Sequence, residues 1–199
     1  MKIAVYGATG AIGSAIVAEA RSRGHEVTGI SRRGADDSDH VTGDALDAGF
    51  ATEIAEKHDV IVSAIGPSRV SDDGTRFVDS IANLVATLGN RRLVVVGGAG
   101  SLQVDGVRLV DSPDFPDAYK SESLKGAASL ALLRETADDV DWTYLSPAPV
   151  ILPGERTGSY TVELETPAGD QISIPDYAVA LVDEIEQPKH VRQRFTVAS

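Results

Sequence analysis

Cysteine is absent from this chain of 199 residues, and its absence excludes disulfide bonds, thiolate metal ligands and cysteine nucleophiles. Long apolar runs are absent too, so the sequence predicts no membrane-spanning helix. The first residues show no signal peptide, because Lys2 leads directly into the strand-like segment Ile3-Ala4-Val5. Together these features lead us to expect a cytoplasmic protein without a membrane partner.

Basic residues are scarce, with 18 Lys and Arg against 30 Asp and Glu and a formal net charge of −12. We expect no nucleic-acid partner, because proteins that bind the phosphate backbone usually present a basic face. The candidates for a local basic patch are Arg32-Arg33 and Arg91-Arg92.

Metal ligands are also poorly represented. Three of the histidines, His25, His40 and His58, precede predicted strands, which puts them at the end of the sheet opposite a cofactor. The acidic run at residues 36–39 lacks the rest of a calcium-loop pattern. We therefore expect no metal site and no histidine base.

A glycine-rich turn follows the first predicted strand. Gly7, Gly10 and Gly13 stand at G-x-x-G-x-x-G spacing, and a helical pattern begins directly behind them. In a dinucleotide-binding turn, Gly7 would allow the sharp bend, Gly10 the approach of a pyrophosphate and Gly13 the close packing of the helix. Free N–H groups of the first helical turn would face the phosphates. The turn therefore predicts a bound dinucleotide, with a ligand-free tight turn as the alternative.

The end of the second predicted strand distinguishes the two forms of the dinucleotide. Sites that prefer NAD carry an acidic residue there, which binds the ribose hydroxyls. This chain instead has Ser31, Arg32 and Arg33, whose hydroxyl and guanidinium groups suit a 2′-phosphate. We expect NADP, with NAD as the alternative, and note that the nearby acidic run would partly cancel the local field.

Strands and helices alternate along the rest of the chain. This pattern predicts an α/β fold, a Rossmann-type doubly wound parallel sheet in the order 3-2-1-4-5-6 plus a late strand, with helices on both faces. We expect one domain over residues 1–199, in which 146–199 form a small C-terminal portion on the substrate side. The first predicted strand ends before Gly7. The later predicted strands cover 25–30, 41–43, 58–65, 91–96, 140–145 and 194–197. The predicted helices cover 12–23, 46–57, 77–88, a segment from Ser121 or Ser123 to about Arg134, and a segment from Pro175.

Two further segments lie at predicted strand ends. Asp44 is placed either to contact an adenine amino group or to cap the next helix, and one residue can do both. Ala64, Ile65 and Gly66 should border the centre of the cofactor. Residues 103–118 look irregular and are placed to act as a lid.

Four segments together resemble the atypical short-chain dehydrogenase superfamily. They are Gly-Ala-Thr-Gly-Ala-Ile-Gly at 7–13, Val-Val-Val-Gly-Gly-Ala-Gly-Ser at 94–101, Asp-Trp-Thr-Tyr-Leu-Ser-Pro-Ala at 141–148 with Pro-Gly at 153–154, and Asp-Tyr-Ala-Val-Ala at 176–180. The chain looks similar to small NAD(P)-binding proteins described as NADH-flavin reductases, which are related to biliverdin reductase B and to NmrA-like proteins. This resemblance implies a Rossmann fold that binds NAD(P). It also implies pyrophosphate contacts from Gly7, Thr9, Gly10, Ala11 and Ile12, a contact of Arg32 with the adenosine ribose, of Asp44 and Ala45 with the adenine, and of Ala64, Ile65 and Gly66 with the nicotinamide ribose.

The chain departs from that superfamily in one important respect. Short-chain dehydrogenases that reduce carbonyls use a Tyr-x-x-x-Lys pair, and no tyrosine of this chain has a lysine four places later. A flavin needs less from the protein, because the reduced flavin can take a proton from solvent. The remaining catalytic candidates are Ser101, as a hydrogen-bond donor to a substrate or as a turn residue, and Tyr119, as a substrate contact or as loop packing.

The sequence therefore predicts an NAD(P)H-dependent reductase that transfers a hydride to a flavin, quinone or similar planar acceptor. The alternative is a non-catalytic NADP-binding redox sensor or regulatory module of the NmrA-like kind, because the same scaffold hosts enzymes and sensors.

Overall fold

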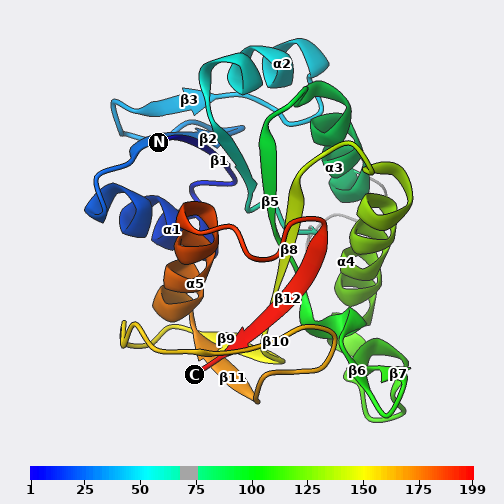
Figure 1. Cartoon of the computed structure of the whole chain (residues 1–199). Helices are drawn as coiled ribbons and strands as arrows, with labels where there is room; N and C mark the ends of the chain where they lie inside the picture. Colours follow the sequence, from blue (N-terminus) through cyan, green and yellow to red (C-terminus); the bar gives the residue numbers. More distant parts are fainter. Residues whose placement is uncertain (68–75) are drawn as a thin grey trace.

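A computed structural model describes residues 1–67 and 76–199, which form an α/β fold around an eight-stranded sheet (Figure 1). The strands follow the order β10-β12-β8-β5-β4-β1-β2-β3, and all neighbours are parallel except β10 and β12. This order confirms the predicted one, and β10 is an additional antiparallel edge strand. The strands are β1 (Lys2–Tyr6), β2 (Glu26–Ser31), β3 (His40–Thr42), β4 (Val60–Ser63), β5 (Arg92–Val96), β8 (Trp142–Pro147), β10 (Thr161–Glu163) and β12 (Gln193–Ala198).

Helices cover both faces of the sheet, as the doubly wound pattern predicts (Figure 1). α1 (Ala11–Ser22) and α5 (Ile174–Glu186) pack on one face. α2 (Ala48–Lys57), α3 (Arg76–Thr87) and α4 (Asp117–Thr136) pack on the other. The central strands are apolar on both faces because each face is buried under a helical layer.

The segment predicted to be irregular is more ordered than expected. It contains a hairpin of β6 (Gln103–Val104) and β7 (Val107–Arg108), between two short 3₁₀ helices, η1 (Ala99–Ser101) and η2 (Leu109–Asp111). Asp105 and Gly106 both have positive φ, the backbone conformation of a tight Asp-Gly hairpin turn. The predicted start of the fourth helix at Ser121 or Ser123 is also wrong, because α4 begins directly after Pro116.

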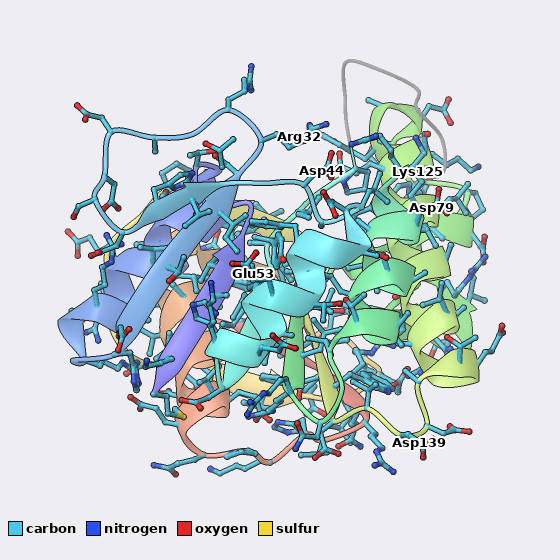
Figure 2. The ribbon with its side chains drawn as sticks, turned by 90° about the horizontal axis from the view of Figure 1, so that it is seen from above. Arg32, Asp44, Glu53, Asp79, Lys125 and Asp139 are labelled. Atoms are coloured by element: carbon cyan, nitrogen blue, oxygen red, sulfur yellow. The ribbon has the colours of Figure 1, made fainter. Side chains whose placement is uncertain are left out.

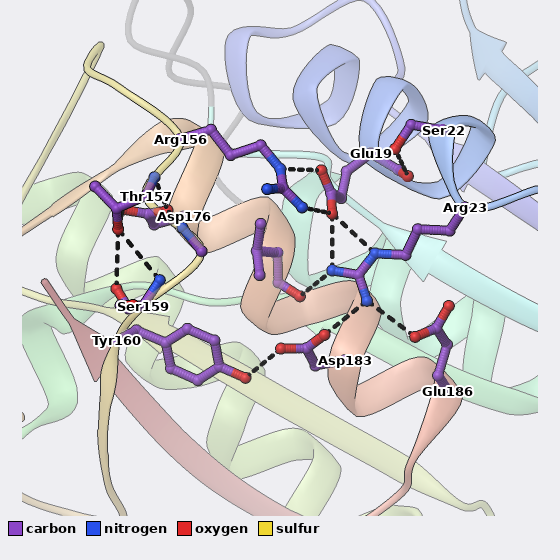
Figure 3. Close-up of polar contacts among 12 residues, drawn as sticks. Glu19, Ser22, Arg23, Arg156, Thr157, Ser159, Tyr160, Asp176, Asp183 and Glu186 are labelled. Atoms are coloured by element: carbon purple, nitrogen blue, oxygen red, sulfur yellow. Dashed lines mark hydrogen bonds and ion pairs between the residues drawn. The ribbon is translucent and has the colours of Figure 1, made fainter.

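The C-terminal portion adds a small two-stranded sheet of β9 (Val150–Leu152) and β11 (Gln171–Ser173). An ionic network fixes this portion to α1 (Figure 3). The buried carboxylate of Glu19 accepts two hydrogen bonds from Arg156, both 2.8 Å long, and pairs with Arg23 at 2.7 Å. Arg23 in turn pairs with Asp183 of α5 at 2.6 Å. The hydrogen bonds from Arg156 and Arg23 lower the pKa of Glu19 to about 2, although burial opposes the shift.

None of the helices within the described residues is long and apolar enough to cross a membrane.

Candidate functional site

A cavity of about 280 Å³ opens at the carboxyl ends of β1, β2 and β4. In open α/β sheets this edge is where ligands bind, beside the point at which the strand order reverses. Eleven residues that the sequence singled out as cofactor contacts line it: Gly7, Thr9, Gly10, Ser31, Arg32, Arg33, Asp44, Ala45, Ala64, Ile65 and Gly66. The other lining residues are Tyr6, Ile30, Gly43, Leu46, Arg76, Phe77 and Ser80.

The glycine turn has the geometry that its spacing predicts. Gly7 has a φ of +79°, and a Cβ there would lie 2.5 Å from the carbonyl oxygen of Ala64. A Cβ on Gly13 would lie 2.1 Å from the carbonyl oxygen of Gly7, so α1 can approach the turn only with glycine at this position. A Cβ on Gly10 would meet only that same carbonyl oxygen, at 3.4 Å. Gly10 therefore leaves space on the cavity side rather than avoiding a clash within the protein.

The start of α1 is prepared for an anion. Gly10 is its N-cap residue and supplies no side-chain hydrogen bond, and the first turn carries no acidic side chain. The N–H groups of a first helical turn have no partner within the helix and lie at the positive end of its dipole. The predicted contacts Ala11, Ile12 and Gly13 belong to this turn, although their side chains do not line the cavity. These features fit a pyrophosphate group.

Two arginines stand at the cavity mouth after β2. Arg32 and Arg33 are exposed, and within the described residues neither is paired with a carboxylate. Figure 2, seen from above, shows Arg32 on the same side of the molecule as Asp44, and both residues line the cavity. Two members of the acidic run pair with Arg21 instead: Asp37 at 2.8 Å and Asp39 with the same guanidinium at 3.8 Å.

Ser31 has a partner that the sequence did not indicate. The Nε2 atom of His40 lies 2.8 Å from the Ser31 hydroxyl. The prediction that His40 lies at the end opposite the cofactor is therefore wrong. β3 is short and begins opposite Gly29 of β2, so its first residue already lies near the carboxyl edge.

Asp44 does not cap the next helix, so that prediction is wrong. The N-cap of α2 is Asp47, whose side chain accepts a hydrogen bond from the backbone N–H of Phe50. Asp44 accepts one from the N–H of Leu46 at 3.1 Å, and its other carboxylate oxygen pairs with Arg76. Sequence reasoning missed Arg76, because only the packing of α3 against this turn reveals its proximity.

The end of β4 closes the other side of the cavity. The backbone N–H of Ala64 donates to the carbonyl of Tyr6 at 2.8 Å, which extends the pairing of β4 with β1 to the site. Ile65 and Gly66 then turn away from the sheet along the cavity. They line the cavity beside the glycine turn, and their contact with the centre of a cofactor stays a prediction.

Polar groups without partners lie at this edge of the sheet. Within the described part of the chain, the buried hydroxyls of Tyr6 and Ser63 have no hydrogen-bond partner. Burial raises the pKa of Tyr6, and the carboxylate of Asp47 acts in the same direction, so the phenol stays protonated and remains a donor. A buried donor without a partner costs free energy, which a polar ligand in the cavity would reduce.

The two catalytic candidates do not line this cavity. The Ser101 hydroxyl accepts a hydrogen bond from the buried Arg194 at 3.3 Å. The ring of Tyr119 is half exposed near the start of α4. A substrate role for either residue stays a prediction.

The glycines after β5 make room for protein atoms. A Cβ on Gly97 would lie 2.1 Å from the ring of Tyr144, and one on Gly100 would lie 2.5 Å from the Cβ of Ser123. At both positions, packing against β8 and α4 is already sufficient to require glycine.

A second, more open cavity of about 980 Å³ lies in the C-terminal portion, between the β9–β11 sheet and β10. Its buried carboxylate, Asp176, already accepts hydrogen bonds from the backbone N–H groups of Thr157 and Gly158, each at 2.8 Å. Across residues 1–67 and 76–199, no group of three or more His, Asp or Glu side chains is arranged to hold a metal ion.

Comparison with known proteins gives consistent results. The chain matches a protein family described as NAD(P)H-binding over residues 7–188. It is 37% identical over 213 residues to the uncharacterized protein YwnB of Bacillus subtilis (strain 168), an alignment that covers 100% of this chain and 99% of YwnB. The crystal structure of SP1627 from Streptococcus pneumoniae TIGR4, described as "a putative NADH-flavin reductase", superposes with a TM-score of 0.91 at 36% identity, covering 100% of this chain and 99% of SP1627. A structure from Burkholderia pseudomallei, described as a "putative exported protein", superposes with a TM-score of 0.89 at 40% identity, covering 100% of both chains.

Proposed function

The chain belongs to the NAD(P)H-binding family, and from this premise we propose that it is an NADPH-dependent reductase whose acceptor is a flavin, a quinone or a similar planar molecule. Bound NADPH would supply a hydride, and the acceptor would take the accompanying proton from solvent. The protein's own contribution is to bind and orient the two molecules and to exclude water.

The observation that carries the choice of acceptor is the state of the tyrosine side chains. Carbonyl reduction needs a positioned acid that protonates the developing alkoxide. The hydroxyls of Tyr144 and Tyr177 are buried and donate to the carbonyls of Gly126 and Leu145. Tyr160 donates to Asp183 at 2.6 Å. Tyr6 lines the cavity, but burial raises its pKa, so its phenol can donate a hydrogen bond and is a weak proton donor. Tyr119 does not line the cavity. An acceptor that needs no protein acid therefore suits this site best.

The preference for NADPH is supported by the charges at the cavity mouth. A 2′-phosphate carries about two negative charges and binds guanidinium groups through charge-assisted hydrogen bonds. Arg32 and Arg33 offer these groups with no carboxylate partner among the described residues. NAD would instead call for an acidic residue after β2, where this chain has Ser31.

The relative from S. pneumoniae is described as "a putative NADH-flavin reductase", which supports a flavin as the acceptor and does not support the choice of NADPH over NADH. A second candidate function is a non-catalytic NADP-binding redox sensor. It is favoured by one observation, that neither catalytic candidate, Ser101 or Tyr119, lines the cavity. The cytoplasmic location expected from the sequence stays a prediction.

An acceptor screen separates the two functions. Purified protein with NADPH and FMN, FAD or a quinone should show loss of the nicotinamide absorbance at a rate proportional to enzyme concentration. NADPH binding without turnover on any of these acceptors would contradict the reductase and support the sensor.

A further inference from the structure

The cavity is bridged by an ion pair between two elements that are far apart in the sequence. Arg76, the first residue of α3, donates from its guanidinium to the carboxylate of Asp44, which follows β3. Both side chains are half-buried, and both line the cavity. The other oxygen of Asp44 accepts the N–H of Leu46, which fixes the carboxylate and, through it, the guanidinium.

The stability of the fold does not explain this pair. Ion pairs with this much exposure contribute little to the free energy of unfolding, because solvent screens them. The pair is also formally neutral. A paired guanidinium is a weaker ligand for an additional phosphate than a free one, but it keeps its flat face, which stacks well on aromatic rings.

The surroundings of the pair suit a flat base. If the glycine turn holds the pyrophosphate and the end of β2 holds the ribose, the base lies beyond them, over residues 43–46. Apolar side chains line this part of the cavity, as they do in most sites for planar ligands. They are Ala45 and Leu46 of this segment and Phe77, which follows Arg76. At about 280 Å³ the cavity suits one nucleoside half of a dinucleotide rather than the whole molecule.

We propose that the Arg76 guanidinium stacks on the adenine ring of the bound dinucleotide and that Asp44 positions it there. The inference rests on the proposed cofactor site and adds a division of roles within it. Arg32 and Arg33 select the 2′-phosphate, whereas Arg76 contributes affinity for the adenine that NADH and NADPH share.

Equilibrium titrations of Arg76→Ala test the inference without any turnover. Stacking on a cation contributes a factor of about threefold to thirtyfold in affinity. We expect Arg76→Ala to lower the affinities for NADPH, NADH and AMP by the same factor within this range. Nicotinamide mononucleotide, which has no adenine, should bind the variant and the wild type equally. The melting temperature should stay unchanged, because the side chain is half exposed.

The role of Asp44 is tested by introducing Asp44→Asn into the wild type and into the Arg76→Ala variant. If Asp44 acts through Arg76, Asp44→Asn lowers the affinity of the wild type for AMP. The same substitution has no further effect on that affinity in the Arg76→Ala variant. A further loss in that background would overturn the positioning role and assign Asp44 a direct contact. If Arg76→Ala lowers the affinity for NADPH alone, or leaves the affinity for AMP unchanged, the proposed stacking is overturned. Failure of the wild type to bind either dinucleotide would instead contradict the proposed function itself.

Discussion

Asp37 accepts a hydrogen bond from Arg21 of α1 at 2.8 Å, so this carboxylate of the loop after β2 is held against α1. The hydrogen bond from Arg21 lowers the pKa of Asp37, so the pair stays charged at neutral pH. Asp37 is therefore engaged by Arg21 and not by Arg32 or Arg33, which line the cavity.

Arg32→Ala should lower the affinity for NADPH far more than the affinity for NADH. The variant loses a charge-assisted hydrogen bond to the 2′-phosphate, which contributes about 1.5 kcal/mol or more, a factor of about ten in affinity. Titration of each dinucleotide by fluorescence or calorimetry gives the two ratios. Lys57→Ala is the control, because Lys57 is an exposed cation that does not line the cavity. Equal losses for NADPH and NADH in Arg32→Ala would show that the arginine is merely solvated.

Alanine at two glycines should separate ligand binding from folding. Gly13→Ala places a Cβ 2.1 Å from the Gly7 carbonyl oxygen, so the turn must shift. We expect a cost of about 1–3 kcal/mol, which lowers the melting temperature by several degrees. Gly10→Ala replaces a better N-cap residue and should cost about 1 kcal/mol or less.

Gly10→Ala should have a large effect on the affinity for dinucleotides, although its effect on stability is small. Its methyl group occupies the space for the pyrophosphate, so NADPH and NADH should both weaken about tenfold or more. Thermal unfolding and titration of the same preparations provide the two readouts. If Gly10→Ala binds both dinucleotides normally, the pyrophosphate does not lie at this turn.

The Glu19 network should make stability depend on pH. Because the folded-state pKa of Glu19 is about 2 against an ordinary value of 4.5, its carboxylate stabilises the fold above about pH 5. This contribution, about 3 kcal/mol, is lost as the pH falls from about 5 to 2. Glu19→Gln should therefore be less stable than the wild type at neutral pH, and the difference should shrink on acidification.

Chemical denaturation at neutral pH and at about pH 3 measures that difference directly. The matched control is Glu53→Gln, which removes an exposed partner of Lys57 and should have little effect at either pH. A difference between Glu19→Gln and the wild type that does not change with pH would contradict the ionic account of the network.

Ser101→Ala should lower the melting temperature and leave kcat unchanged. The variant removes one acceptor from the fully buried Arg194, whose loss we expect to cost about 1–2 kcal/mol. Differential scanning calorimetry and steady-state kinetics are the two measurements. A fall in kcat with unchanged stability would instead return Ser101 to the reaction centre, the role that the sequence left open.

Local patterns were sufficient to predict the sheet order and most of the cavity. The glycine turn could be predicted because its main constraints act within one strand-turn-helix unit, as the close approach of Gly13 to the Gly7 carbonyl oxygen confirms. Ser31, Arg32 and Arg33 could be predicted because their place depends only on the length of β2.

Two of the errors have a different cause, which is packing between distant elements. Arg76 reaches Asp44 only because α3 lies beside the turn after β3, a contact between positions separated by 32 residues. His40 reaches Ser31 because β3 begins late on the edge of the sheet. Of the two roles open for Asp44, the N-cap role fails for a local reason, because Asp47 is also acidic, also precedes the apolar pattern and is the residue that caps α2.

The measurement that tests the central claim most directly is kcat/KM for NADPH and for NADH with FMN as a fixed acceptor. The account predicts oxidation of both dinucleotides, with a value for NADPH at least about tenfold higher, because Arg32 and Arg33 line the cavity and would bind a 2′-phosphate. Oxidation of neither, or a higher value for NADH, would contradict it.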